Sequence, residues 1–190
     1  MQSQDRRAFF REVLRRVVEP AADFVEGQLE STGMKEGPFL RPPGALGEEA
    51  FLETCHRCGS CIEACPANAI LPLKAQQKEL EGTPYIDPIH QPCVVCDDLA
   101  CMSVCPSGAL QIVHREEIRI GLAVLNEASC IRTEEEPCRI CADLCPVGDS
   151  AIEAKEAMPI VVQEDGCIGC GVCEHVCPTS PKSIKIQIIN

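Results

Sequence analysis

Sixteen cysteines in four short runs constrain this chain more than any other feature of its sequence. The runs begin at Cys55, Cys93, Cys130 and Cys167, so they repeat every 37 or 38 residues. Each run has four cysteines and ends in Cys-Pro, followed by a turn of small residues and an apolar residue. A fixed period of this size indicates a repeated structural unit. We therefore expect four related units within residues 51–190.

The spacing inside the runs indicates iron–sulfur ligation. The first run has the pattern C-x2-C-x2-C-x3-C-P, and the fourth repeats it. In such a run three thiolates bind one 4Fe–4S cluster, and the fourth binds the cluster of a partner run. The runs must therefore work in pairs, and sixteen thiolates complete four 4Fe–4S clusters with none left over. The predicted ligands are Cys55, Cys58, Cys61, Cys65, Cys93, Cys96, Cys101, Cys105, Cys130, Cys138, Cys141, Cys145, Cys167, Cys170, Cys173 and Cys177.

Two other uses of clustered cysteines fit less well. Structural zinc sites use paired C-x2-C knuckles rather than tight triplets that end in Cys-Pro. A disulfide framework needs an oxidising compartment, and hence an apolar secretion signal at the start of the chain. Charged residues from Arg11 to Glu19 interrupt the apolar residues there. The sequence therefore predicts cluster ligands in a cytoplasmic protein.

Composition narrows the function further. The 190 residues include no Trp, one Tyr and five Phe, so metal rather than a large aromatic core is expected to stabilise the fold. The net charge of −12 disfavours nucleic-acid binding and suits docking to a basic patch on a protein. No apolar run is long enough to span a membrane, and neither a dinucleotide fingerprint nor a P-loop occurs. We predict an electron carrier or electron-transfer subunit without catalytic residues of its own.

Local patterns predict the secondary structure. Alternating or short apolar stretches predict strands within 118–125, 160–162 and 184–189. The stretch from the second to the fourth cysteine of each run predicts one or two helical turns. Residues 1–30 have an apolar face with helical spacing and are predicted to form an amphipathic helix. Residues 31–50 are rich in Gly and Pro, which predicts a linker.

The predicted N-terminal helix also carries five arginines between Arg6 and Arg16 in an otherwise acidic chain. Its basic face makes it a candidate docking element for a partner protein or a membrane surface. Packing against the cysteine units is an equal alternative. Within the runs, His56 and His175 are expected outside the ligand shell, because each cluster already has four thiolates. Gly59, Gly169 and Gly171 are expected to let backbone N–H groups approach cluster sulfur.

The segments PCVVCDDLACMSVCPSGAL (92–110), PCRICADLCPVGDSAI (137–152) and DGCIGCGVCEHVCP (165–178) resemble the MauM/NapG-type polyferredoxins. The resemblance covers about residues 50–190. It implies an α+β fold of two bacterial dicluster-ferredoxin-like modules, made of short β-hairpins, cysteine loops and short helices, plus the N-terminal helix. It also implies four 4Fe–4S clusters and redox partner proteins. The family usually has a twin-arginine export signal, and Arg6-Arg7 lie in a similar box. Charged residues follow that box, so we expect the cytoplasm, with the periplasm as the alternative.

The wide gap in the second run also resembles the iron–sulfur subunits of molybdenum oxidoreductases, in which the outer runs pair and the inner runs form an inserted module. That resemblance implies nested pairing. Sequential pairing, first run with second and third with fourth, is the alternative. The nested sets are Cys55, Cys58, Cys61 and Cys177; Cys167, Cys170, Cys173 and Cys65; Cys93, Cys96, Cys101 and Cys145; and Cys130, Cys138, Cys141 and Cys105.

The cysteine runs are compatible with two functions, and they disfavour a third. The first is a carrier that relays single electrons between a donor and an acceptor protein. The second is the electron-transfer subunit of a larger quinol- or molybdenum-linked oxidoreductase complex. A cluster-delivery factor would need labile clusters, and complete ligation by four cysteines argues against it.

Overall fold

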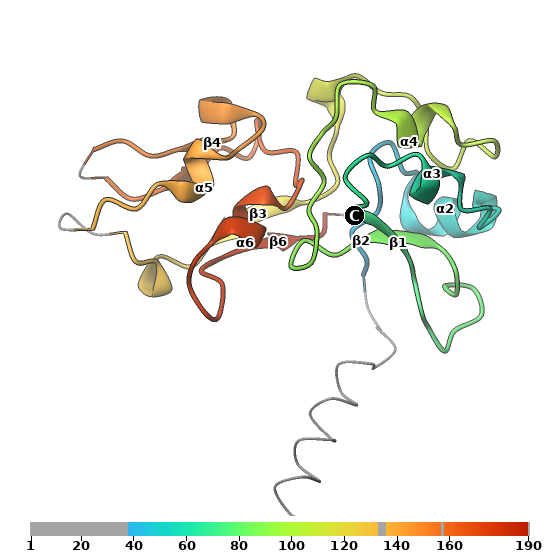
Figure 1. Cartoon of the computed structure of the whole chain (residues 1–190), viewed down its shortest axis with the longest axis horizontal. Helices are drawn as coiled ribbons and strands as arrows, with labels where there is room; N and C mark the ends of the chain where they lie inside the picture. The colour runs from blue at the N-terminus through green and yellow to red at the C-terminus, as the bar shows by residue number, and fades with distance from the viewer. Residues whose placement is uncertain (1–37, 133–135, 157, 190) are drawn as a thin grey trace, which may run out of the picture. The chain divides into compact units, whose positions relative to one another are not determined.

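The computed structural model describes residues 38–132, 136–156 and 158–189 (Figure 1). These residues belong to one compact unit, 36–190. The predicted amphipathic helix over 1–30 and the first part of the predicted linker lie outside the described residues. In the ranges that are described, no helix is both long and apolar enough to cross a bilayer.

Four one-turn helices form where the sequence predicts them, between the second and fourth cysteines of the runs. They are α3 (Ser60–Glu63), α4 (Ala100–Ser103), α5 (Ile140–Asp143) and α6 (Val172–Val176). Each carries the third cysteine of its run. Helix α3 packs against α4, and α5 packs against α6. The helices of consecutive runs therefore face each other in pairs.

Two antiparallel hairpins return the chain from one run to the next. Strand β1 (Ile70–Pro72) pairs with β2 (Pro84–Ile86), between the first and second runs. Strand β4 (Ile152–Glu153) pairs with β5 (Val161–Val162), between the third and fourth runs. Strands β1 and β4 begin at the apolar residue that follows the Cys-Pro turn. Each hairpin is short, so it brings the next run back beside the preceding one.

A third strand pair joins distant parts of the chain. Strand β3 (Leu122–Leu125) runs antiparallel to β6 (Ile184–Gln187), which follows the fourth run. The predicted strands at 118–125 and 184–189 are confirmed, although both are shorter than predicted. Three 3-10 turns complete the connections: η1 (Arg115–Glu117), η2 (Glu127–Ser129) and η3 (Gly148–Ser150).

The second half of the predicted linker is folded rather than extended. Leu40 forms an antiparallel bridge with Ile86, and Pro42 and Pro43 are fully buried. Proline has no backbone N–H, so it can be buried without leaving a donor unpaired. Helix α2 (Glu48–Thr54) follows at once and leads into the first run. The linker prediction is therefore wrong for residues 38–50, whose Gly and Pro residues shape a packed segment.

A buried arginine fastens this segment to the first hairpin. The Arg41 guanidinium donates to both carboxylate oxygens of Glu48, at 2.9 and 2.5 Å, and to Thr83 Oγ1 and the Pro84 carbonyl, at 2.9 Å each. Its central carbon lies 4.7 Å from the centre of the Phe51 ring, within cation–π distance. The charge is thus fully partnered although the side chain is buried.

Arg41→Ala is expected to lower the free energy of unfolding by about 3 kcal/mol, because the pair is partly buried and its loss leaves Glu48 and the Pro84 carbonyl without their donor. Anaerobic urea titration of the cluster-loaded protein measures the change. Arg57→Ala is the control, since Arg57 donates to the Glu79 carbonyl at the exposed surface; its cost should stay under about 0.5 kcal/mol. Equal losses in both variants would contradict the role given to Arg41.

Three apolar cores lie under these elements of the described chain; the two larger ones contain cysteines, and the small third one is Phe39, Leu73 and Leu80. Side chains of Leu, Ile and Val fill the first core around Phe51, and the second core has Ile and Ala but no aromatic side chain. The buried cysteines of the first core are Cys61, Cys101 and Cys170, and those of the second are Cys167, Cys173 and Cys177.

Candidate metal centres

Cysteines from two consecutive runs line each of three small pockets of similar size. In every case four cysteines line one pocket, three from one run and one from the adjacent run. We name the sets group I, group II and group III. Group I is Cys55, Cys58, Cys61 and Cys105; group II is Cys65, Cys93, Cys96 and Cys101; group III is Cys145, Cys167, Cys170 and Cys173.

The remaining four cysteines belong to the third and fourth runs. The nearby charges of Cys130 and Cys138 help to raise the pKa of Cys141. Cys141 also packs in the same core as Cys177. Cys177 also holds the position in its run that Cys105 holds in the second run. We name Cys130, Cys138, Cys141 and Cys177 group IV.

Each group is made of three cysteines of one run and the last cysteine of the adjacent run. This is sequential pairing, and the nested pairing is wrong: Cys105 lies with Cys55, Cys58 and Cys61, where nested pairing requires Cys177. Likewise Cys145, not Cys65, completes the pocket of the fourth run. The modules are therefore runs one with two and runs three with four, rather than an outer and an inner pair.

The hairpins explain why the pairing is sequential. After Cys65 the chain makes one Cys-Pro turn, the β1–β2 hairpin, and arrives at Cys93 beside its starting point. The β4–β5 hairpin does the same after Cys145. A nested arrangement would need the chain to leave the first run and return only after two others. The short hairpins close each pair before that can happen.

Backbone N–H groups donate to several of the thiols. Ala69 N–H donates to Cys65 Sγ at 3.3 Å, and Leu110 N–H donates to Cys105 Sγ at 3.4 Å. In the second module Ala123 N–H donates to Cys167 Sγ at 3.4 Å. Such donors stabilise the negative charge of a thiolate ligand and of the cluster it holds. These three donors come from the residues after Cys-Pro and from β3. Backbone hydrogen bonds from Ser60 and Val172, which follow Gly59 and Gly171, also act on Cys58 and Cys170.

Hydroxyl groups add a second kind of contact that our sequence analysis missed. Ser60 Oγ lies 3.4 Å from Cys58 Sγ, Ser107 Oγ 3.6 Å from Cys105 Sγ, and Thr179 Oγ1 3.1 Å from Cys177 Sγ. In each case the hydroxyl residue stands two positions after the cysteine. That spacing is visible in the sequence, so a search for Ser or Thr at this offset would have found all three.

Burial raises the pKa of the thiols deepest in the groups. It raises the pKa of Cys61 and Cys93 to about 11, and that of Cys101 to about 12. In the second module burial raises the pKa of Cys141 to about 11 and that of Cys170 to about 12. Neighbouring thiolates of the same group add to the effect for most of these thiols, because like charges repel. Without a metal, the closed groups therefore hold their protons.

Hydrogen bonds have the opposite effect on three thiols. The Ser60 hydroxyl lowers the pKa of Cys58, which is exposed. Burial by itself would raise the pKa of Cys105 and Cys177, but the donors around each sulfur together outweigh burial and lower it. In groups I and IV, the last cysteine of the run (Cys105 and Cys177) therefore loses its proton more readily than an ordinary thiol.

Iron retention is expected to fall as the pH is lowered. The pKa values of Cys93, Cys101 and Cys170 are about 11 to 12, above the roughly 8.5 of an unfolded thiol. Because clusters bind thiolates, cluster loading must remove the protons from these three thiols. Protons therefore compete with iron more strongly at every step down from about pH 9 to pH 6. Anaerobic incubation with an iron chelator at each pH, followed by iron counting, measures this. Retention that is constant or higher at low pH would contradict it.

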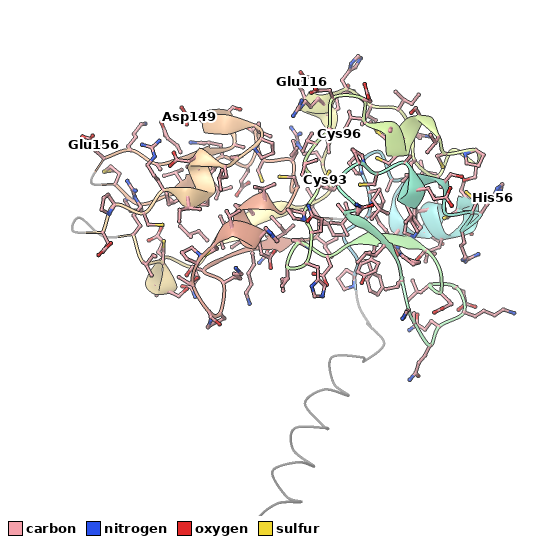
Figure 2. The ribbon with its side chains drawn as sticks, viewed as in Figure 1. His56, Cys93, Cys96, Glu116, Asp149 and Glu156 are labelled. Carbon is pink, nitrogen blue, oxygen red and sulfur yellow. The ribbon has the colours of Figure 1, made fainter. Side chains whose placement is uncertain are left out.

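The two histidines within the runs have different surroundings. His56 is exposed at the edge of the described part (Figure 2), where it lines the pocket of group I. His175 is half-buried, and its Nδ1 lies 3.1 Å from the Pro88 carbonyl. Among the described side chains of His, Cys, Asp and Glu, no three converge on a position for a single metal ion. The cysteines instead line the walls of pockets, which is the arrangement that a cluster of several atoms requires.

Comparison with known proteins agrees with this arrangement. Residues 54–109, which contain the whole first module of cysteines, match the 4Fe-4S dicluster domain family, and residues 160–181 match the 4Fe-4S binding domain family. A dicluster match over the first two runs is what sequential pairing requires. The fold, the cysteine groups and these matches define an α+β ferredoxin-type iron–sulfur protein that binds 4Fe–4S clusters.

Three relatives identify the family. The ferredoxin-type protein NapG of Escherichia coli is 38% identical over 95% of this chain and 84% of its own. The methylamine utilization ferredoxin-type proteins MauM of Methylorubrum extorquens and Methylobacillus flagellatus are 35% and 32% identical, over 83% and 98% of this chain and 76% and 85% of their own. The chain belongs to the family of NapG and MauM ferredoxin-type proteins, which confirms the resemblance found in the sequence.

Proposed function

We propose that this protein holds four 4Fe–4S clusters, one in each cysteine group, and relays single electrons between redox partner proteins. The observation that carries the proposal is the division of all sixteen cysteines into four groups of four, three of them around pockets of similar size. Four thiolates are the ligand set of one 4Fe–4S cluster. The ferredoxin-type relatives support electron transfer as the use of these clusters.

The chain's own residues would supply three things to each cluster. The thiolates hold it, and the N–H donors of Ala69, Leu110 and Ala123 stabilise negative charge on sulfur. The apolar walls of the pockets, such as Ile70 and Val95 in group II, exclude water. When bound, a 4Fe–4S cluster supplies a site that takes up and gives back one electron. No residue of the described part then needs to act as an acid, a base or a nucleophile.

A second candidate is an electron-transfer subunit of a larger oxidoreductase complex, with catalysis on another chain. The observation that favours it is an apolar surface next to group IV: Ile140 and Leu144, 40% and 54% exposed, flank Cys141 in and after α5. Apolar side chains around a redox centre suit a lasting contact with a partner. Co-purification of a stoichiometric partner would favour the subunit, and a monodisperse monomer would favour the carrier.

We also propose that the protein works in the cytoplasm and that residues 1–30 dock it to a partner. Both rest on the sequence, where charged residues follow Arg6-Arg7 and five arginines give the predicted helix a basic face. Cell fractionation of the full chain with a C-terminal tag tests the location. Recovery in the periplasm would make Arg6-Arg7 part of an export signal and would withdraw the docking role as well.

An anaerobic redox titration followed by electron paramagnetic resonance tests the main proposal. Iron and sulfide are counted on the same sample. About sixteen iron and sixteen sulfide per chain, with several signals that appear over a series of potentials, would support four redox clusters. About eight iron or fewer after clean reconstitution, or clusters that do not change between oxidising and reducing conditions, would overturn it.

A further inference from the structure

The segment from Cys167 to Cys173 lies between the two larger apolar cores and contributes to both. Cys167 and Cys173 are buried in the second core, whereas Ile168 and Cys170 are buried in the first. Although Cys170 belongs to group III, the charge of Cys93 of group II acts on its thiol. The two modules are therefore in contact here through cysteines of groups II and III.

Two peptide hydrogen bonds join this segment to residues of the first core. The Cys93 N–H donates to the Cys170 carbonyl at 3.0 Å, and the Ile120 N–H donates to the Ile168 carbonyl at 3.1 Å. The first of these links a residue of group II directly to a residue of group III. The bonded path from one sulfur to the other consists of the two cysteine side chains, their backbone atoms and this one hydrogen bond.

Glycines make the close approach possible. Gly171 has φ +89°, and a Cβ there would lie 2.6 Å from Pro88 Cβ; Gly169 has φ +75°, and its Cβ would lie 2.3 Å from the Gly121 nitrogen. Gly59 holds the same place in the first run as Gly171 holds in the fourth, with φ +80°, but a Cβ on Gly59 would meet nothing within 4 Å. Backbone conformation accounts for Gly59, whereas Gly171 is also needed for contact with the first module.

A histidine adds a polar contact across the same boundary. His175 Nδ1 lies 3.1 Å from the Pro88 carbonyl and 3.2 Å from the Ile89 carbonyl. Carbonyl oxygens only accept, so Nδ1 carries the proton and donates. His175 thus fastens α6 to the stretch that begins at Pro88 and ends at the Cys93 amide.

We propose that the joint formed by residues 88–93 and 168–175 fixes the spacing of groups II and III and couples them through the Cys93–Cys170 hydrogen bond. The four groups then form one continuous row, in the order I, II, III, IV, rather than two separate pairs. Gly171 and His175 act in this joint as positioning residues, since neither is a ligand. The inference rests on the proposed function, because coupling has a use only if both groups hold redox clusters.

Gly171→Ala tests the joint, because its methyl group would displace Pro88 while all sixteen cysteines remain. Gly148→Ala is the matched control: Gly148 has φ +77°, lies in the same module, and its Cβ would meet nothing within 4 Å. Hydrogen exchange of the Cys93 amide in the loaded protein, read by mass spectrometry, reports the hydrogen bond. Paramagnetic resonance of the fully reduced protein reports the magnetic interaction between neighbouring clusters.

With Gly171→Ala we expect exchange of the Cys93 amide to rise about tenfold or more relative to Gly148→Ala, with a weaker magnetic interaction and an unchanged iron count. Exchange no faster than in Gly148→Ala would overturn the joint. Faster exchange with an unchanged magnetic interaction would overturn the coupling. If Gly171→Ala loses iron, the same exchange and resonance measurements on His175→Phe test the joint instead. Phe keeps a ring of similar size and removes the Nδ1 donor to the Pro88 and Ile89 carbonyls.

The outcomes also separate this inference from the proposed function. If the unmodified protein holds about eight iron or fewer, or its clusters do not change with potential, the proposed function fails. The exchange difference between Gly171→Ala and Gly148→Ala can be measured in that case too. If the iron count is about sixteen and the two variants behave alike, the relay stands and the joint fails.

Discussion

Cys55→Ser combined with Cys105→Ser is expected to remove about four of about sixteen iron atoms, no more than either substitution does alone. Both cysteines line the pocket of group I. The second substitution therefore removes a ligand of a cluster that the first substitution has already removed. Effects within one group should therefore be strongly non-additive. Iron counting on anaerobically purified protein, with paramagnetic resonance to detect a three-iron remnant, measures the loss.

The matched comparison is Cys55→Ser combined with Cys177→Ser. Under sequential pairing these cysteines belong to groups I and IV, so the double variant should lose about eight iron atoms, the sum of the two single losses. Nested pairing predicts the reverse, with additive loss for Cys55 and Cys105 and a single loss for Cys55 and Cys177. The two double variants contain the same number of substitutions, so general damage to the fold does not distinguish them.

Removal of iron is expected to unfold most of the described chain. The longest helix in that part, α2, has seven residues, and its longest strands have four, so none of these elements is stable alone. Cys61 and Cys101 in the first core, and Cys167 and Cys173 in the second, would face emptied pockets. Loss of a structural metal can remove on the order of 10 kcal/mol of folding free energy, more than a small domain has in reserve.

Circular dichroism and limited proteolysis after anaerobic chelation measure this unfolding. The same sample, reloaded with iron and sulfide, is the control for irreversible damage, and it should regain its spectrum and its resistance to protease. A native-like spectrum in the iron-free sample would show that the apolar cores suffice. Cys101 and Cys170, with pKa values raised to about 12, would then remain protonated thiols in a folded apo-protein.

Local structure was predictable because it depends on neighbours in the sequence. The alternating Ile residues from Ile184 form the predicted strand β6, and each third cysteine lies in a one-turn helix, as the runs predict. The linker prediction failed at residues 38–50, because composition does not reveal that Leu40 bridges to Ile86. Gly171 could not be assigned its role either, because the contact with Pro88 joins residues 83 positions apart.

The pairing of the runs depended on a feature that spacing does not encode. All four runs are compatible with either order, since every run offers three ligands and one for a partner. The β1–β2 and β4–β5 hairpins decide between the two orders by returning the chain at once. Their short strands, of two and three residues, leave too weak a pattern to fix the topology from the sequence.

The hairpins also have a consequence for how the protein is made. All ligands of groups I and II lie between Cys55 and Cys105, so both sets of thiols are complete before the third run has been synthesised. The first two clusters can be inserted while the second half of the chain is still on the ribosome. Groups III and IV then complete against a half that is already filled. Under the nested order, by contrast, both outer clusters would have waited for Cys177 or its neighbours, with their thiols open to oxidation throughout synthesis.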